Sequence, residues 1–256
     1  MRFKPDTRIL IAVMLALPVA SAAQTAAPKA RPAPQQSTQA PRLLKAFVVD
    51  DRLSALRKEA DMKSQVTQRL RLSRPVYIIG SSSGEAGQPK FYRVAVTRRT
   101  RGWIHASALA IPGRPGEDLR LVKLAEDATD GLDRIALCFL LTEQFKTSPL
   151  VPQALLITGG EAERVATTLS QRAAKRLAAV DPKASGARLR DYYLNDAALD
   201  RFSKLRVSFD FDEAAGEYVY DGNAYRAIIK RFPASEAAKT ARAKLDLVEQ
   251  KLARRH

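Results

Sequence analysis

The amino-acid sequence predicts an α+β chain with more than one domain, in which a small β-rich domain precedes an α-helical region. Two changes along the chain indicate this order. Short runs of β-branched residues, which are typical of strands, gather between residues 46 and 112. From residue 116 onward, apolar residues recur every three or four positions, as they do in amphipathic helices. Hydrophobic residues make up 46% of the 256 positions, which is enough for a folded core.

The first 23 residues have the pattern of a cleavable secretory signal peptide. Three basic residues precede an apolar run from Ile9 to Leu17, and small residues follow that run. This order of segments is typical of export signals, and the apolar run is too short to cross a bilayer as a helix. We therefore expect a periplasmic or secreted protein with no transmembrane span after cleavage. An N-terminal anchor and a buried helix are the alternatives.

The rest of the chain divides into a linker and two domains. Residues 24–42 are rich in Ala, Pro, Gln and Ser and lack large apolar residues. Such a composition is typical of a flexible or extended linker. We expect the β domain at residues 43–112 and the helical domain at residues 113–256.

The β domain is expected to be a small barrel. Its strand-like runs are short, and the Ser- and Gly-rich stretch from Gly80 to Gly87 is typical of a loop between strands. The segment from Phe91 to Val96 alternates, so that Arg93 and Tyr92 are expected on opposite faces of a strand. Three to five short strands in a domain of this size fit a small barrel.

Two segments of this domain resemble bacterial SH3 domains. One runs from Arg52 to Gly80 (RLSALRKEADMKSQVTQRLRLSRPVYIIG) and resembles the opening turn, strand and diverging turn of that family. The other runs from Phe91 to Leu109 (FYRVAVTRRTRGWIHASAL) and resembles its closing hairpin, with Gly-Trp-Ile at 102–104 in place of Gly-Trp-Val. Phe91 or Tyr92 stands where the family often has a second Trp. The resemblance covers residues 46–111 and implies an SH3-like β-barrel that binds an anionic cell-wall component or a peptide.

The helical domain begins with two predicted helices. Apolar residues at helical spacing run from Leu121 to Ala128, and the stretch from Leu132 to Phe145 is apolar nearly all round, which predicts a buried helix. The pair of glycines at 159–160 is expected to be a turn. A third helix would then open at Glu161, because an acidic residue favours a helix N-terminus.

The C-terminal residues carry the clearest helical pattern. Apolar side chains follow an i, i+3, i+4, i+7 spacing from Tyr225 to Phe232, and Pro233 ends that helix. Ser235 is placed to cap a second helix, whose apolar positions also step by three and four. This pattern predicts an antiparallel helix hairpin.

An internal repeat relates this hairpin to an earlier one. The same offsets of 0, 3 and 9 separate two sets of residues: Phe145, Ser148 and Ala154, and Phe232, Ser235 and Ala241. In each copy we expect a helix that ends in an aromatic residue, a tight turn at Ser, and small Ala residues where helices touch. The distance between the copies requires a divergent repeat or an insertion within residues 181–220.

The hairpin sequence is similar to a known family of repeats. The segment from Tyr225 to Leu245 (YRAIIKRFPASEAAKTARAKL) resembles the TPR-type repeats of envelope proteins. Examples are the accessory protein of the Tol–Pal system and the helical lipoprotein of the outer-membrane assembly machine. The resemblance implies a TPR-like helical region that presents a concave surface to a protein partner.

The sequence offers few residues for catalysis. Cys138 is the only cysteine and lies in an apolar stretch, so a buried structural thiol is expected. His105 lies in a predicted strand, where packing or solvent exposure is expected in place of catalysis, and His256 is the other histidine. The acidic group Asp210, Asp212 and Glu213 lacks the ligand spacing of an EF-hand and is expected in a solvated loop. We therefore predict no catalytic residue, no metal site and no cofactor.

Positive charge is concentrated in the β domain. The formal net charge is +16; residues 43–112 have thirteen basic and five acidic residues (+8), whereas residues 113–256 have twenty-four and twenty-one (+3). The densest cluster lies at residues 98–101, where a hairpin tip with three guanidinium groups would suit carboxylates or phosphates. Ordinary surface charge that maintains solubility is the alternative. The candidate ligand contacts are Tyr92, Arg98, Arg99, Arg101 and Trp103.

These features favour a non-enzymatic interaction protein of the bacterial periplasm. The β domain would bind peptidoglycan, another anionic envelope polymer or a peptide, and the helical region would bind an envelope protein. The alternative function is that of a cell-wall hydrolase accessory or activator in which the SH3-like part targets the wall. Nucleic acid is not an expected partner, because the chain has an export signal and no recognisable base-stacking motif.

Overall fold

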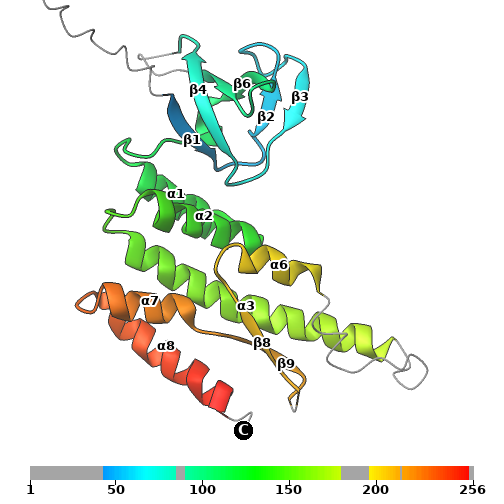
Figure 1. The fold of residues 1–256 in the computed structure, drawn as a ribbon, viewed down its shortest axis with the longest axis vertical. Helices are drawn as coiled ribbons and strands as arrows, with labels where there is room; N and C mark the ends of the chain where they lie inside the picture. The colour runs from blue at the N-terminus through cyan, green and yellow to red at the C-terminus, as the bar shows by residue number, and fades with distance from the viewer. Residues whose placement is uncertain (1–42, 85–89, 180–195, 214, 254–256) are drawn as a thin grey trace, which may run out of the picture. The chain divides into compact units, whose positions relative to one another are not determined.

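The computed structural model describes residues 43–84, 90–179, 196–213 and 215–253. The predicted signal peptide (1–23), the predicted linker (24–42) and His256 lie outside the described residues. A β-sheet comes first and helices follow it, which confirms the predicted α+β order (Figure 1).

The sheet is antiparallel and has more strands than the sequence predicts. Its strands in chain order are β1 (Leu44–Val48), β2 (Ala55–Arg57), β3 (Val66–Arg69), β4 (Pro75–Ser81), β5 (Phe91–Ala95), β6 (Arg101–His105) and β7 (Leu109–Ala110). Their order in space is β3-β2-β6-β5-β4-β1-β7. A short 3-10 helix at Ala106–Ala108 precedes β7.

The expected closed barrel is not formed. β3 lies at one edge of the sheet beside β2, and β7 lies at the other edge beside β1. β7 has only two residues, and both pair with β1. All four residues of β3 are exposed, and a register shift between Leu56 and Arg57 interrupts its pairing with β2. The edge strands are thus short and irregular, which leaves the sheet open.

One face of the sheet carries its apolar core. Leu56, Val94 and Ile104 are fully buried and belong to one cluster. Gly102 of β6 lies against this cluster, and a Cβ at that position would be 2.6 Å from Leu56 Cγ. A glycine is therefore required where the two strands pack this closely.

Helices and one hairpin make up the rest of the described chain. They are α1 (Glu117–Asp127), α2 (Gly131–Gln144), α3 (Val151–Ala178), α6 (Ala197–Ser203), β8 (Phe209–Asp212), β9 (Glu217–Tyr220), α7 (Asn223–Arg231) and α8 (Glu236–Ala253). α1 and α2 confirm the first two predicted helices, and the Asp130 carboxylate caps α2. None of the described helices is both long and apolar enough to pass through a bilayer.

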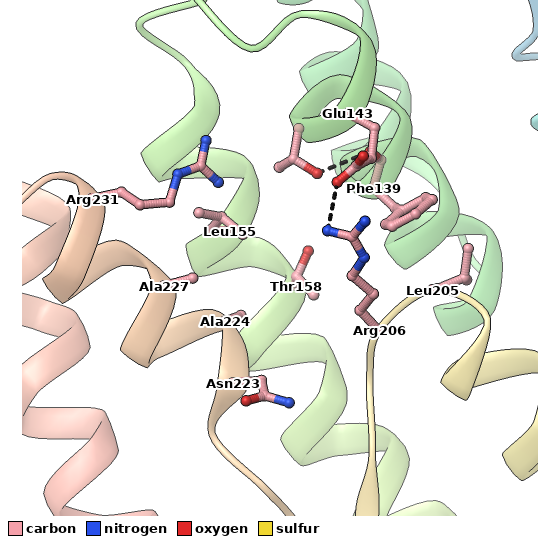
Figure 2. Close-up of a pocket in the computed structure, with 11 residues that line it drawn as sticks. Phe139, Glu143, Leu155, Thr158, Leu205, Arg206, Asn223, Ala224, Ala227 and Arg231 are labelled. Carbon is pink, nitrogen blue, oxygen red and sulfur yellow. Dashed lines mark hydrogen bonds and ion pairs between the residues drawn. The ribbon is translucent and has the colours of Figure 1, made fainter.

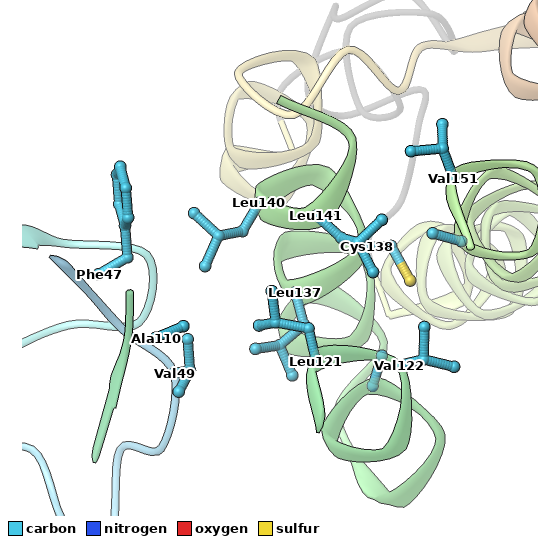
Figure 3. Packing of buried hydrophobic residues seen from close by; sticks show 12 residues of the cluster. Phe47, Val49, Ala110, Leu121, Val122, Leu137, Cys138, Leu140, Leu141 and Val151 are labelled. Atoms are coloured by element: carbon cyan, nitrogen blue, oxygen red, sulfur yellow. The ribbon is translucent and has the colours of Figure 1, made fainter. Parts of the chain in front are cut away.

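A buried cluster joins the sheet to the first helices. Phe47, Val49 and Ala110 from the sheet side lie with Leu140 of α2 in this cluster (Figure 3). Cys138 belongs to the same cluster and is buried, which confirms the predicted buried thiol. The described residues belong to one compact unit.

The predicted turn at 159–160 is wrong, because α3 continues through both glycines. Tyr225 of α7 packs on Gly159, where a Cβ would lie 2.6 Å from the Tyr225 Cζ atom. Tyr225 is 1% exposed, and its hydroxyl donates a hydrogen bond to Glu163 of α3. Gly159 therefore allows α3 and α7 to approach closely, and it does not end a helix.

The internal repeat corresponds to one helix–turn–helix corner that the chain uses twice. Phe145 ends α2 and Phe232 ends α7, and the amide of each donates to the carbonyl four residues earlier. The amides of Ser148 and Ser235 then donate to these Phe carbonyls at 2.9 and 3.0 Å. Each Ser hydroxyl accepts a hydrogen bond from an amide at the start of the next helix. The small residues of the repeat are fully buried: Ala154 and Ala241.

Between the two corners lie α6 and the β8–β9 hairpin, which occupy part of the region where the sequence requires an insertion. The prediction of a solvated loop at Asp210, Asp212 and Glu213 is wrong for the two aspartates, because both belong to β8 and Asp212 is buried. Glu213 is exposed in the turn that follows β8. The aromatic residues of β8 stand opposite Tyr218 and Tyr220 of β9, and their rings are in contact. Such cross-strand aromatic pairs favour a strand over a loop.

Candidate functional site

Two described residues, Cys138 and His105, are of types that can act in catalysis. The contacts of both are those of residues that support the fold. Burial raises the pKa of the Cys138 thiol to about 12, so the thiol stays protonated. The His105 ring packs edge-on against Phe91 with 5.4 Å between ring centroids, and its Nδ1 accepts a hydrogen bond from the Ser107 amide. Burial lowers the pKa of His105. In the described part of the chain, no three His, Cys, Asp or Glu residues are grouped as a metal ion would require.

A row of three side chains crosses the sheet on the face opposite its apolar cluster. Trp103 of β6 stands directly opposite Arg93 of β5 on one side and Arg57 of β2 on the other. Residues that stand directly opposite in antiparallel strands point to the same face, with Cβ atoms about 5 Å apart. Arg93 is exposed, and Trp103 and Arg57 are half-buried. The row therefore places Trp103 between two arginine residues on one face of the sheet.

A second row lies beside the first. Arg101 precedes Trp103 by two residues on β6 and stands opposite Ala95, which in turn stands opposite Tyr77 of β4. Arg101 is exposed, and Tyr77 is 42% exposed. We refer to the surface formed by the two rows as the cationic face, and its members are Arg57, Tyr77, Arg93, Arg101 and Trp103.

The cations of this face have no carboxylate partner among the described residues. Arg57 uses Nη1 to donate a hydrogen bond to the Ser64 carbonyl at 2.8 Å, which leaves its other donors available. In the loop between β1 and β2, outside the strands that form this face, Arg52 does pair with a carboxylate, that of Asp50 at 3.3 Å. Uncompensated guanidinium groups on a surface favour the binding of an anion.

Trp103 and Arg101 are the predicted contacts that the structure brings together on this face. Tyr92 is not among them, because it stands opposite Ile104 and its ring belongs to the apolar cluster on the other side of the sheet. Tyr92 is only 7% exposed, and its hydroxyl accepts a hydrogen bond from Arg114 at 3.3 Å. Strand alternation therefore separates Tyr92 from Trp103.

Arg98 and Arg99 lie in the tight turn between β5 and β6, where the sequence places a hairpin tip. The Val96 amide donates to the Thr100 carbonyl at 2.9 Å, and the Thr97 hydroxyl accepts from the amides of Arg99 and Thr100. Both arginines are exposed. The turn thus adds positive charge at one end of the cationic face, next to Arg101.

The sequence does not single out Arg57 and Arg93 as contacts. For Arg93 a signal exists, because the alternation in β5 already puts it on the face opposite Tyr92. No local pattern marks Arg57, which reaches the face only through the pairing of β2 with β6.

A second candidate site is a pocket in the helical region, between α2, α3 and α7 (Figure 2). Its volume is about 270 Å³, and Phe139 and Leu155 contribute apolar walls. Arg206, from the segment between α6 and β8, places Nη1 2.9 Å from Glu143 Oε1. The same guanidinium lies 5.7 Å from the centre of the Phe139 ring. The pocket thus combines an apolar lining with a charged pair that remains open to solvent.

Comparison of the chain with models of known protein families, with curated proteins and with solved structures found no match. The function is therefore inferred from the chemistry of the cationic face and of the helical pocket.

Proposed function

We propose that the protein is a non-enzymatic interaction protein of the bacterial periplasm. Its β region acts as an SH3-like module that binds an anionic cell-wall component, and its helical region acts as a TPR-like partner-binding module. The observation that carries the proposal is the row Arg57–Trp103–Arg93, in which an aromatic ring lies between two arginines that have no carboxylate partner among the described residues.

The chemistry of this row suits peptidoglycan better than it suits a small neutral ligand. Peptidoglycan carries carboxylates on the peptide stems that repeat along its sugar chains, and a guanidinium group binds a carboxylate with paired hydrogen bonds. The indole of Trp103 supplies a flat apolar surface on which the CH groups of a sugar ring can pack. A polymer that repeats both features would contact several residues of the face at once.

Two further features are consistent with the proposal. The sequence has the pattern of an export signal, which would bring the chain to the compartment where peptidoglycan lies. The helix–turn–helix corner used twice is the kind of unit from which helical repeat proteins build partner-binding surfaces.

The proposal is tested by sedimentation of the purified protein with insoluble peptidoglycan. We expect the double variant Arg57→Ser/Arg93→Ser to reduce the retained fraction at least tenfold, because it removes both cations beside Trp103. The matched control is Arg98→Ser/Arg99→Ser, which removes the same charge from the hairpin turn and should have a smaller effect. An equal loss from both variants, or no retention of the wild-type protein, would contradict the proposed site.

The non-enzymatic part of the proposal has a separate test. In a zymogram with cell-wall substrate, the purified protein is expected to give no lytic band. A lytic band that persists in preparations of high purity would instead favour a hydrolase.

A further inference from the structure

Arg206 occupies a backbone position that favours glycine. Its φ is +60°, in the left-handed region. The Arg206 amide donates to the Ser203 carbonyl at 2.9 Å, and the Val207 amide donates to the Phe202 carbonyl at 3.1 Å. These two bonds form the Schellman motif that ends α6, and Arg206 is its left-handed residue, a place usually taken by Gly. A side chain with a Cβ is strained there, so its presence calls for a reason.

The contacts that the Arg206 side chain makes within the protein are too weak to explain an arginine at this strained position. Arg206 is 73% exposed on its side chain, and its pair with Glu143 is open to solvent. Exposed pairs of this kind add little to stability. The pair also uses Nη1 of Arg206, and a guanidinium group has five N–H donors in total. Donors therefore remain for a second carboxylate.

The surroundings of Arg206 define what a ligand must look like. Arg231 lines the same pocket on the α7 side, and its guanidinium lies 5.1 Å from the centre of the Phe232 ring, so the pocket lining contains two arginines and one carboxylate, Glu143 (Figure 2). Phe139, Leu155 and Ala227 supply apolar walls of the pocket. A volume of about 270 Å³ is slightly below the range of about 300–1,000 Å³ for small-molecule pockets, so it suits a few side chains better than a whole cofactor.

We infer that this pocket binds an acidic peptide segment of a partner protein, with Arg206 as the residue that recognises an Asp or Glu carboxylate beside an apolar side chain. This inference rests on the proposed function, since it gives the helical region its partner chemistry. The excess of arginine over glutamate selects the negative charge, and the apolar walls take the neighbouring side chain. Glu143 holds Arg206 in place in the free protein and competes with the ligand for it.

The test is selection of a phage-displayed library of random octapeptides on the purified full chain. We expect enrichment of peptides with Asp or Glu next to an apolar residue. For one enriched peptide, fluorescence anisotropy should show at least tenfold weaker binding when its acidic residue is replaced by the amide. Arg206→Gly should weaken binding of the acidic peptide at least tenfold, while the thermal midpoint stays equal or rises by about 2–4 °C because strain is relieved.

Two further variants keep the test independent of folding. Arg206→Asn retains a residue that tolerates the left-handed region and should also lose binding. Glu143→Gln removes the competing carboxylate and should strengthen binding severalfold. A lower midpoint with unchanged peptide binding for Arg206→Gly would assign Arg206 a purely structural role. Enrichment of neutral or basic peptides, or of none, would also overturn the inference.

The same variants separate this inference from the proposed function. Arg206→Gly should leave sedimentation with peptidoglycan unchanged, because the cationic face is intact. If peptidoglycan retention fails but acidic peptides still bind through Arg206, the proposed wall-binding function is wrong and the pocket stands. The reverse result removes the pocket alone.

Discussion

Arginine has different neighbours in the two parts of the molecule. In the helical region, Arg134 and Arg164 both bind the buried carboxylate of Glu161 at 2.5 Å, and Arg120 binds Glu117 at 2.6 Å. On the cationic face of the sheet, Arg93 and its neighbours have no carboxylate partner among the described residues. The contrast agrees with the net charges of +3 for residues 113–256 and +8 for residues 43–112.

The difference separates arginines that hold the fold from arginines that are left for a ligand. Arg134 donates to the carbonyls of Ala125, Glu126 and Ala128 at the end of α1, and it also neutralises Glu161. Those carbonyls would otherwise lack partners, because the last carbonyls of a helix have none within it. Arg93 performs no comparable task, so its charge is free to act on another molecule.

The largest effect on stability is expected when the buried ion pair between Arg134 and Glu161 is removed. Arg134→Met should lower the free energy of unfolding by about 3 kcal/mol. The substitution leaves Glu161 with one arginine partner, and it removes the hydrogen bonds that Arg134 donates to the carbonyls at the end of α1. The urea midpoint, followed by circular dichroism, measures this. A loss of less than about 1 kcal/mol would break the comparison, because Arg134 would then behave like a surface arginine.

A smaller effect is expected at the crossing of α3 and α7. Gly159→Ala should destabilise by about 2 kcal/mol, because the new Cβ collides with the Tyr225 ring. Gly160→Ala is the matched control, since a Cβ there meets nothing within 4 Å and should add about 1 kcal/mol of stability. Equal changes in stability for Gly159→Ala and Gly160→Ala would contradict the close packing of Tyr225 on Gly159.

The smallest effect on stability is expected on the cationic face. Arg57→Ser/Arg93→Ser should change the free energy of unfolding by no more than about 0.5 kcal/mol per site, because Arg93 is exposed and Arg57 loses a single hydrogen bond, to the Ser64 carbonyl. Thermal unfolding of the variant and of the wild type measures this. A destabilisation comparable to that of Arg134→Met would mean that these arginines support the fold, and their role in binding would lose its basis.

Much of the helical region could be predicted from the sequence, because its signals are local. The spacing from Tyr225 to Phe232 gave the buried face of α7, and the offsets of Phe, Ser and Ala gave both helix corners. The prediction of a turn at Gly159 is wrong because glycine is typical both of turns and of close helix crossings. Only the position of Tyr225 distinguishes the two cases.

The sites were less predictable, because they depend on pairings between distant segments. Trp103 and Arg101 could be found from composition and charge, whereas Arg57 joins them only once β2 pairs with β6. Tyr92 looked suitable as an aromatic contact, but the register of β5 against β6 turns it to the core. Arg206 gave no signal in the sequence, since a left-handed arginine is visible only in the backbone.

The most direct test of the cationic face uses the only tryptophan of the chain, Trp103. Soluble peptidoglycan fragments are titrated into the protein while its intrinsic fluorescence is recorded. We predict a saturable change in Trp103 emission that weakens as salt is raised and is absent from Arg57→Ser/Arg93→Ser. Fragments that bind by calorimetry and leave the emission of Trp103 unchanged would contradict the account, because the ligand would then lie elsewhere.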